Sequence, residues 1–212
     1  LRIGEEIFMI ITMDSLTERE KYRILTSCIV PRPIAWVTTI DHNGVVNAAP
    51  FSYFTGISIE PPLVVFAVER RHGNKKDTVI NIEETKEFVV NVVTIDNVNE
   101  MNETSQDYDH DIDELAFSSL TEIPSQFVKP PSIQESPVHL ECKLDQIIEV
   151  GSSPHSLIIG EVKVITLKDD LYDNGRLDMN KLQAVGRMGG RHYVKSDSLF
   201  ELDRLDWRKT TI

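Results

Sequence analysis

Residues 34–40 read IAWVTTI, residues 41–44 read DHNG and residues 45–49 read VVNAA. The outer two stretches hold the β-branched and aromatic residues that favour strands. The Asn43-Gly44 pair between them is typical of a tight turn, because both residue types tolerate positive φ. Pro50 is expected to stop the second strand, since it has no N–H to donate. The sequence therefore predicts an antiparallel hairpin over residues 34–49.

Outside this hairpin, most of the predicted elements are strands. Further strands are expected at residues 63–68, 88–93, 138–150 and 156–167. Short helices are expected at residues 15–25, with Ser15 as the N-cap, and at residues 78–84 and 96–106. The second half of the chain lacks the strand–helix alternation of a parallel sheet. We therefore predict a mainly β fold, one antiparallel β-barrel with short peripheral helices.

Composition narrows the class of protein. A chain of 212 residues with 41% hydrophobic residues suits one well-buried domain, expected at residues 13–212 after an N-terminal extension at residues 1–12. The net charge of −12 disfavours nucleic acid and anionic membrane as partners, and no apolar run approaches the length of a membrane span. The cysteines, Cys28 and Cys142, form no CxxC pair, which favours reduced thiols and a cytoplasmic location. We expect Cys28 to be buried and inert.

A basic loop stands out in this acidic chain. Arg70, Arg71, His72, Lys75 and Lys76 precede the helical run that Asp77 and Thr78 open. Free N–H groups at a helix start and nearby cations form a phosphate site. The loop therefore predicts a bound anion, with a solvated basic turn as the alternative.

Two strand segments offer partners for a flat ring. Trp36, Thr38 and Thr39 supply an aromatic and two hydroxyls, and residues 47–54 read NAAPFSYF. Small residues there permit close approach, and exposed backbone groups can bond the edge of a heterocycle. A tryptophan at such a position is more often a core or interface residue, and the hydroxyls also suit an ordinary strand. Combined with the basic loop, the pattern predicts a site for a planar ring that carries a phosphate.

Several motifs resemble one known family. The motifs are PRPIAWVTT (31–39), NAAPFSYF (47–54), KDTVINI (76–82), IQESPVHLECKL (133–144), HSLIIGEV (155–162) and GGRHY (189–193). They resemble the flavin reductase-like proteins of the FMN-binding split-barrel superfamily, which includes flavoredoxin and the reductase components of two-component flavin monooxygenases. The resemblance spans roughly residues 20 to 195. It implies an antiparallel split barrel of Greek-key type, a homodimer, and FMN in a groove near the subunit interface.

The resemblance also implies roles for individual residues. The ring and ribityl chain of FMN would be bordered by Trp36, Thr38, Thr39, Asn47, Ala48, Ala49, Ser52 and Tyr53. The phosphate would be held by Lys76, Asp77 and Thr78 with the assistance of Arg70. His155, which follows Pro154 where the family tends to carry Asp or a Gly-like residue, would position the flavin or the nicotinamide. The pocket would be closed, or the nicotinamide contacted, by Gly189, Gly190, Arg191, His192 and Tyr193.

The implied activity is an NAD(P)H:flavin oxidoreductase. Hydride would pass from NAD(P)H to the flavin, and electrons would pass on to free flavin, a partner monooxygenase or another acceptor. Such chemistry needs no protein nucleophile, because the protein's part is to bind and orient the rings. The alternatives are a flavoredoxin-type FMN electron carrier without a productive nicotinamide site, and an FMN storage or sensing module.

Other signals are set aside. The alternating aspartates from Asp107 to Asp113 are not a calcium loop, because Ile112 and Ser118 stand where such a loop needs Gly and Glu. The histidines lack metal-ligand spacing, so no metal is expected. The run GRMGG at 186–190 follows no clear strand and opens no clear helix, so a Rossmann fingerprint is rejected. The basic loop lacks the interleaved aromatics of a nucleic-acid patch.

Overall fold

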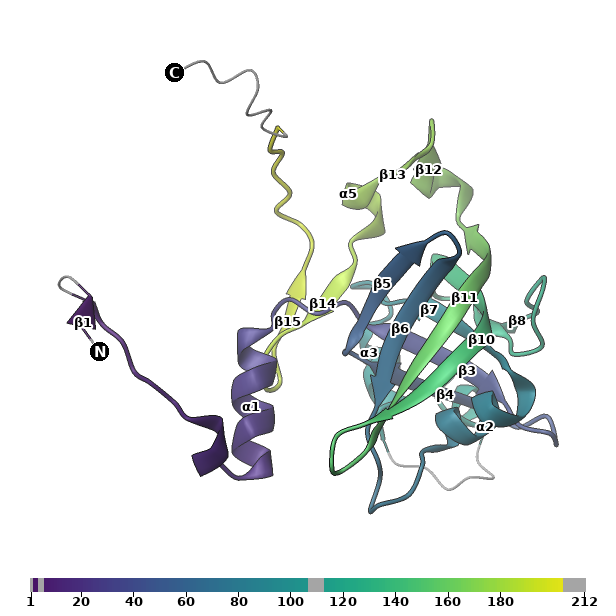
Figure 1. Ribbon diagram of the computed structural model, residues 1–212. Coiled ribbons are helices and arrows are strands. Elements are labelled where there is room, and N and C mark those ends of the chain that lie inside the picture. Colours follow the sequence, from purple (N-terminus) through teal and green to yellow (C-terminus); the bar gives the residue numbers. More distant parts are fainter. Residues whose placement is uncertain (1, 4–5, 107–112, 204–212) are drawn as a thin grey trace.

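The computed structural model describes residues 2–3, 6–106 and 113–203. Its centre is a seven-stranded antiparallel sheet with the strand order β4-β3-β7-β10-β11-β6-β5 (Figure 1). Its strands are β3 (Ala35–Ile40), β4 (Val46–Phe51), β5 (Phe54–Ile59), β6 (Pro62–Val68), β7 (Glu87–Val92), β10 (Val138–Val150) and β11 (His155–Leu167).

The sheet curls until its two ends meet. Phe51 on β4, at one end of the strand order, stacks on Phe66 of β6 with ring centroids 5.3 Å apart. Phe66 also meets Phe88 of β7 edge-on at 5.5 Å. These rings belong to one buried cluster that fills the barrel. The predicted mainly β, antiparallel barrel is confirmed.

The hairpin that the sequence predicts forms as expected. β3 pairs with β4 from Ala35↔Phe51 to Ile40↔Val46, and Gly44 in the turn has φ +90°. The prediction that Pro50 stops the second strand is wrong, since β4 continues to Phe51. Pro50 is tolerated because β4 lies at the end of the sheet order, where none of the described strands pairs with its outer side. β5 was not predicted, because it follows β4 after two residues and reads as part of the same run.

One close approach inside the barrel requires glycine. A Cβ at Gly160 of β11 would lie 2.3 Å from Cζ of Phe88. The aromatic ring thus packs directly on the β11 backbone, and any larger residue would displace it.

Short helices cover two surfaces of the barrel. α2 (Asp77–Thr85) packs Val79 and Ile82 on the interior cluster. α3 (Val98–Glu103) and α4 (Glu114–Phe117) help to cover a second cluster, outside the barrel, that contains Trp36, Met101 and Leu115. Both predicted helices, at residues 78–84 and 96–106, are present, the latter in shortened form.

The first helix begins later than predicted. α1 (Glu18–Cys28) is capped by Thr17, whose side chain accepts from the backbone N–H of Glu20 while the Glu20 carboxylate accepts from the Thr17 N–H. Ser15 instead lies in the 3-10 turn η1 (Met13–Ser15). Cys28 at the end of α1 is exposed, so the expectation that it is buried is wrong.

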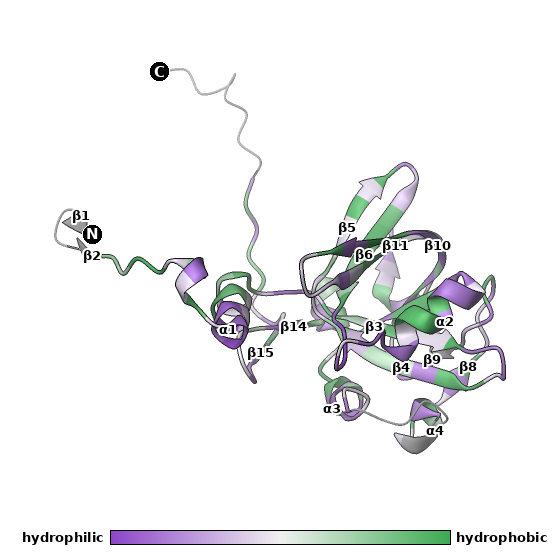
Figure 2. Ribbon diagram, turned by 60° about the horizontal axis from the view of Figure 1, so that its bottom comes forward, coloured by the Kyte–Doolittle hydropathy of each residue, from purple (hydrophilic) through white to green (hydrophobic). Residues whose placement is uncertain are grey.

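The remaining elements lie around or apart from the barrel. They are β1 (Arg2–Ile3), β2 (Glu6–Ile7), β8 (Glu122–Ile123), β9 (Ser132–Ile133), η2 (Asp169–Leu171), β12 (Tyr172–Asp173), β13 (Arg176–Leu177), α5 (Met179–Leu182), β14 (Val185–Arg187) and β15 (Tyr193–Lys195). The segment that leads from β2 to α1 extends away from the barrel and is coloured as hydrophobic over residues 7–11 (Figure 2). Among the described residues, no helix is both long and apolar enough to cross a membrane.

Candidate functional site

A pocket of about 430 Å³ opens at the start of α2. Its walls come from the second half of β4, the loop between β6 and α2, the segment after α3, and α4. The lining residues are Asn47, Ala49, Pro50, Phe51, Arg71, His72, Asn74, Lys75, Lys76, Asp77, Thr78, Thr104, Ser105, Gln106 and Glu114. Three of the four predicted phosphate residues, Lys76, Asp77 and Thr78, thus line one pocket. Two of the eight predicted ring residues, Asn47 and Ala49, line it with them.

The start of α2 is tied to the sheet inside this pocket. Asn47 Nδ2 donates to Thr78 Oγ1 at 3.0 Å, and both side chains are buried. Lys76 is the N-cap of α2 and makes no side-chain cap bond. The first N–H groups of a helix lack acceptors within the helix, and they carry its positive dipole end. This nine-residue helix therefore points its anion-binding end into the pocket.

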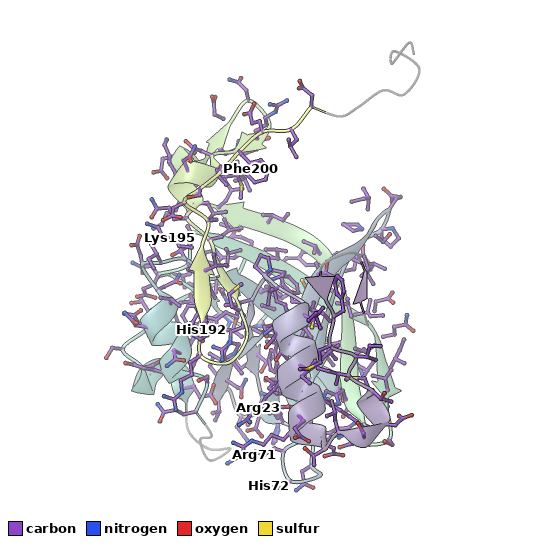
Figure 3. The ribbon with its side chains drawn as sticks, turned by 90° about the vertical axis from the view of Figure 1, so that its left-hand side faces the viewer. Arg23, Arg71, His72, His192, Lys195 and Phe200 are labelled. Carbon is purple, nitrogen blue, oxygen red and sulfur yellow. The ribbon has the colours of Figure 1, made fainter. Side chains whose placement is uncertain are left out.

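Cations gather around the same helix start. Arg71 and His72 lie on the loop before α2 (Figure 3), and Lys75 and Lys76 follow them along the pocket wall. Lys75 is paired with Glu83, and Lys76 Nζ lies 3.8 Å from Glu69 Oε1. The loop therefore concentrates positive charge at the pocket in a chain of net charge −12.

Arg70 points elsewhere. Its Nη2 pairs with Glu149 Oε2 at 2.8 Å, and its Nε donates to the Pro154 carbonyl at 3.3 Å. It fastens the end of β6 to the β10–β11 hairpin and does not line the pocket. The sequence analysis expected Arg70 to assist at the phosphate, but Arg71 is the arginine of this pair that lines the pocket.

A second hollow of about 120 Å³ adjoins the first. The two share Pro50, Phe51 and Lys76. Ser52, Tyr53 and His155 line the second hollow, together with Tyr22 and Thr26 of α1. Burial raises the pKa of Tyr53, so its hydroxyl stays protonated and able to donate.

Arg32, which the sequence analysis includes only within the motif PRPIAWVTT, organises this region. It is 5% exposed, and Nη1 donates to the carbonyls of Thr26 and Ile29 at 2.5 and 2.7 Å. Nη2 donates to the Met188 carbonyl at 3.1 Å and Nε to Ser52 Oγ at 3.4 Å. One buried guanidinium thus joins α1, the β14–β15 hairpin and the end of β4. Its place between two prolines was the available signal, but its partners are distant in sequence.

Four predicted ring residues lie behind the pocket wall. Trp36, Thr38, Thr39 and Ala48 are 0% exposed and line none of these hollows. Trp36 Nε1 donates to Thr104 Oγ1 at 2.9 Å, and Thr38 Oγ1 donates to the Pro131 carbonyl at 2.6 Å. Thr39 Oγ1 accepts from Asn81 Nδ2 at 3.1 Å. These side chains hold the wall in place rather than face a ligand, which agrees with the core alternative for Trp36.

Glu114 is a pocket residue that the sequence analysis missed. It is 7% exposed, and its Oε2 accepts from the Ala48 N–H at 2.7 Å. Burial, with smaller contributions from Asp77 and Asp113, raises its pKa to about 8, against the opposing effect of the Ala48 N–H. Nothing in the local sequence marks this glutamate, because its environment is made by β4 and α2.

The 189–193 run forms the turn between β14 and β15. Figure 3 shows His192 in this turn, and Gly189 packs so closely on α1 that a Cβ there would lie 2.5 Å from Ser27 Oγ. Arg187 lies over the Tyr193 ring at 4.4 Å and donates to the Gly190 carbonyl at 2.7 Å. The Gly-rich segment therefore joins two strands and opens no helix.

Two further hollows connect this hairpin to the ring region. One, of about 200 Å³, is lined by Tyr22, Ile34, Pro50, Ser52, Met101, Asn102, Ser105, Arg187 and Tyr193. The other, of about 610 Å³, is lined by Ile95, Val98, Asn99, Asn102, Val185, Arg187, Arg191, Tyr193, Val194 and Lys195. Arg191 and Tyr193 thus reach a hollow, while Gly189, Gly190 and His192 line none of the four.

No cluster of three metal-ligating side chains occurs among the described residues. The aspartate alternation at residues 107–113 falls outside the described residues, except for Asp113. Asp113 caps α4 by accepting from the Ala116 N–H at 2.9 Å.

Known proteins resemble this chain over most of its length. The family model described as flavin reductase like domain matches residues 26–182. An uncharacterised protein of Halalkalibacterium halodurans is 41% identical over 196 residues, covering 90% of this chain and 94% of its own length.

Two solved structures agree with the whole fold. Nitrilotriacetate monooxygenase component B from Bacillus cereus has a TM-score of 0.90 at 35% identity, covering 93% of this chain and 100% of its own. The 2-nitrobenzoate 2-nitroreductase of Pseudomonas fluorescens has a TM-score of 0.87 at 33% identity, covering 94% of this chain and 98% of its own. Together with the antiparallel barrel and the pocket at the start of α2, these matches show that the chain belongs to the flavin reductase like domain family.

Proposed function

We propose that this protein binds FMN and catalyses hydride transfer from NAD(P)H to the flavin. One observation supports the proposal: the basic pocket at the start of α2 and the hollow at the end of β4 adjoin, because both are lined by Pro50, Phe51 and Lys76. A phosphate and a flat ring joined by a short polar chain need this arrangement. Membership of the family supports the same conclusion.

The residues present fit such a ligand. Lys76, Thr78, Arg71 and His72 hold the phosphate by charge-assisted hydrogen bonds, aided by the start of α2. Asn47 and Ala49 border the ribityl chain.

The end of β4 bounds the ring. Ser52 and Tyr53 supply polar groups at its edge, and His155 lies on the far side of the second hollow. When bound, FMN supplies a two-electron centre that accepts hydride from a nicotinamide and releases electrons to an acceptor. The protein's residues bind, orient and shield the two rings.

The hairpin side suits the second substrate. The hollow of about 610 Å³ is lined by three cations, Arg187, Arg191 and Lys195, and none of the described residues that line it is acidic. Such a wall in an acidic chain attracts an anion as large as the diphosphate of NAD(P)H. The hollow that shares Arg187 and Tyr193 leads from there to Ser52, so the nicotinamide has a route to the flavin. This cationic hollow favours a nicotinamide-dependent enzyme over an electron carrier.

The proposal extends to partners. A relative that is component B of a monooxygenase supports delivery of reduced flavin to a monooxygenase component. Exposed apolar residues outside the barrel, such as Met9 and Phe200 at 85% and 80% exposure, support a homodimer in which they are covered.

Anaerobic mixing tests the activity. Protein loaded with FMN is mixed with NADH or NADPH, and the flavin absorbance near 450 nm is followed. We expect at least one of the two nicotinamides to bleach the flavin absorbance within seconds of mixing. Retention of FMN without bleaching by either nicotinamide would replace the reductase by the electron-carrier alternative. A preparation that takes up no FMN would overturn both.

A further inference from the structure

Glu114 faces the pocket assigned to the phosphate. It approaches from α4, opposite the start of α2, and lines the same cavity as Lys76, Asp77 and Thr78. Its carboxyl is anchored by the Ala48 N–H and is 7% exposed. An ionised carboxylate fixed at this position would repel the phosphate for which the cations are arranged. The presence of a buried acid in an anion pocket therefore needs an explanation.

The surroundings of Glu114 favour its neutral form. Asp113 on α4 and Asp77 on α2 oppose its ionisation, while Lys76 and the Ala48 N–H favour it, and burial outweighs both. Among the other described lining residues, the loop before α2 supplies the cations Arg71 and Lys75 and the imidazole of His72. The remaining polar groups among the described lining residues are uncharged: the amides of Asn47, Asn74 and Gln106 and the hydroxyls of Thr78, Thr104 and Ser105.

Building on the proposed function, we propose that Glu114 is a specificity-determining residue. Its protonated carboxyl group donates a hydrogen bond to the flavin phosphate. A neutral carboxylic acid is a strong donor to a phosphate oxygen, and the Ala48 N–H holds its other end in position. Capture of the phosphate then requires a proton on Glu114. As the pH rises past the pKa of about 8, the ionised carboxylate repels the phosphate, so FMN binds more weakly. Riboflavin has no phosphate, so its affinity does not fall.

The opposite role makes a different prediction. An ionised Glu114 that accepted hydrogen bonds from the ribityl hydroxyls would contribute equally to FMN and riboflavin, since both carry the ribityl chain. It would also favour binding at higher pH. Comparing the two flavins across pH therefore separates the two roles.

The experiment measures Kd for FMN and riboflavin by fluorescence quenching between about pH 7 and pH 9. In this range the phosphate is already a dianion and the lysines remain charged. Linkage to one proton predicts that FMN binds about tenfold more weakly at the upper limit than at the lower, while riboflavin changes little. Glu114→Gln keeps an acceptor for the Ala48 N–H and gains a permanent N–H donor, so its FMN affinity should match the wild type at pH 7 and stay constant with pH.

The control is Glu122→Gln. The pKa of Glu122 is also raised by burial, but this residue lies outside the pocket, so the variant should keep the wild-type pH dependence. FMN affinity that stays constant in the wild type, or falls equally in Glu114→Gln, would overturn the inference. So would equal losses of FMN and riboflavin in Glu114→Gln. In all these outcomes FMN still binds, so the proposed function survives; protein that binds neither flavin would overturn the proposed function and the inference together.

Discussion

At the end of the site proposed to hold the phosphate, Asn47 and Thr78 are buried and bonded to each other between the sheet and α2. At the hairpin end, Arg187 and Tyr193 are only half-buried, and the turn beside them rests on α1 rather than on the barrel. The first half is therefore part of the barrel and forms whenever the barrel folds. The second half is built on the short strands β14 and β15, which Val185, Arg187 and the Met188 carbonyl attach to the rest of the molecule. Such short elements open more easily than a barrel. Flavin binding and nicotinamide binding should accordingly be separable by mutation.

Removing the phosphate contacts should have the largest effect. The double substitution Lys76→Ala and Thr78→Ala removes a cation and a hydroxyl, and each charge-assisted hydrogen bond contributes about 1.5–3 kcal/mol. We expect FMN to bind at least about 100-fold more weakly and riboflavin to change by less than about threefold. Titration with both flavins measures this, and equal losses would mean that these residues do not hold the phosphate.

The phosphate end should also govern how stability depends on pH. The pKa of Glu114 is raised from 4.5 to about 8 in the folded protein, so the folded state keeps a proton that the unfolded chain releases. This contribution is complete below about pH 4.5 and is lost as the pH rises to about 8, by up to about 1.4 kcal/mol per pH unit. Urea unfolding of the flavin-free protein should show this decline, and Glu114→Gln should flatten it. If the stability of Glu114→Gln declined with pH as steeply as that of the wild type, other groups would be responsible for the decline.

At the hairpin end, Arg187→Ala should affect the nicotinamide alone. Loss of one charged hydrogen bond from a partly exposed position predicts a rise of about tenfold in KM for NAD(P)H. FMN affinity should change by less than about twofold, because Arg187 lies outside the phosphate pocket. Steady-state kinetics and a flavin titration test the two halves of this prediction. Arg176→Ala, on exposed β13, is the control; a parallel loss of FMN would show that the two ends are not independent.

The smallest effect is expected at Arg70. Its guanidinium is occupied by Glu149 and Pro154, so Arg70→Gln should change FMN affinity by less than about twofold. Arg71→Gln is the matched comparison and should weaken FMN binding several-fold. A larger loss for Arg70 than for Arg71 would reverse the assignment of these neighbours.

What the sequence could predict follows the same division. Local sequence patterns were enough to predict three parts of the fold. A turn pair specifies the β3–β4 hairpin, a helix start specifies α2, and two long apolar runs specify the β10–β11 pair. The basic loop that lines the pocket could be identified for the same reason.

Contacts between distant segments could not be predicted. Arg32 and Glu114 acquire their roles from partners such as Met188 and Ala48, which lie far from them in sequence. Trp36 and Thr38 were expected at the ring because strand alternation does not reveal which face of the sheet meets a ligand. Arg70 and Arg71 are adjacent, and only the path of the loop decides which one faces the pocket.

The central claim is that the start of α2 holds the phosphate of a flavin whose ring lies at the end of β4. A crystal structure of the protein with FMN tests it most directly. The account predicts the phosphate within hydrogen-bond distance of Thr78 Oγ1 and Lys76 Nζ, and the ring beside Ser52 and Tyr53. A phosphate bound at the β14–β15 hairpin, or a ring located away from β4, would contradict it.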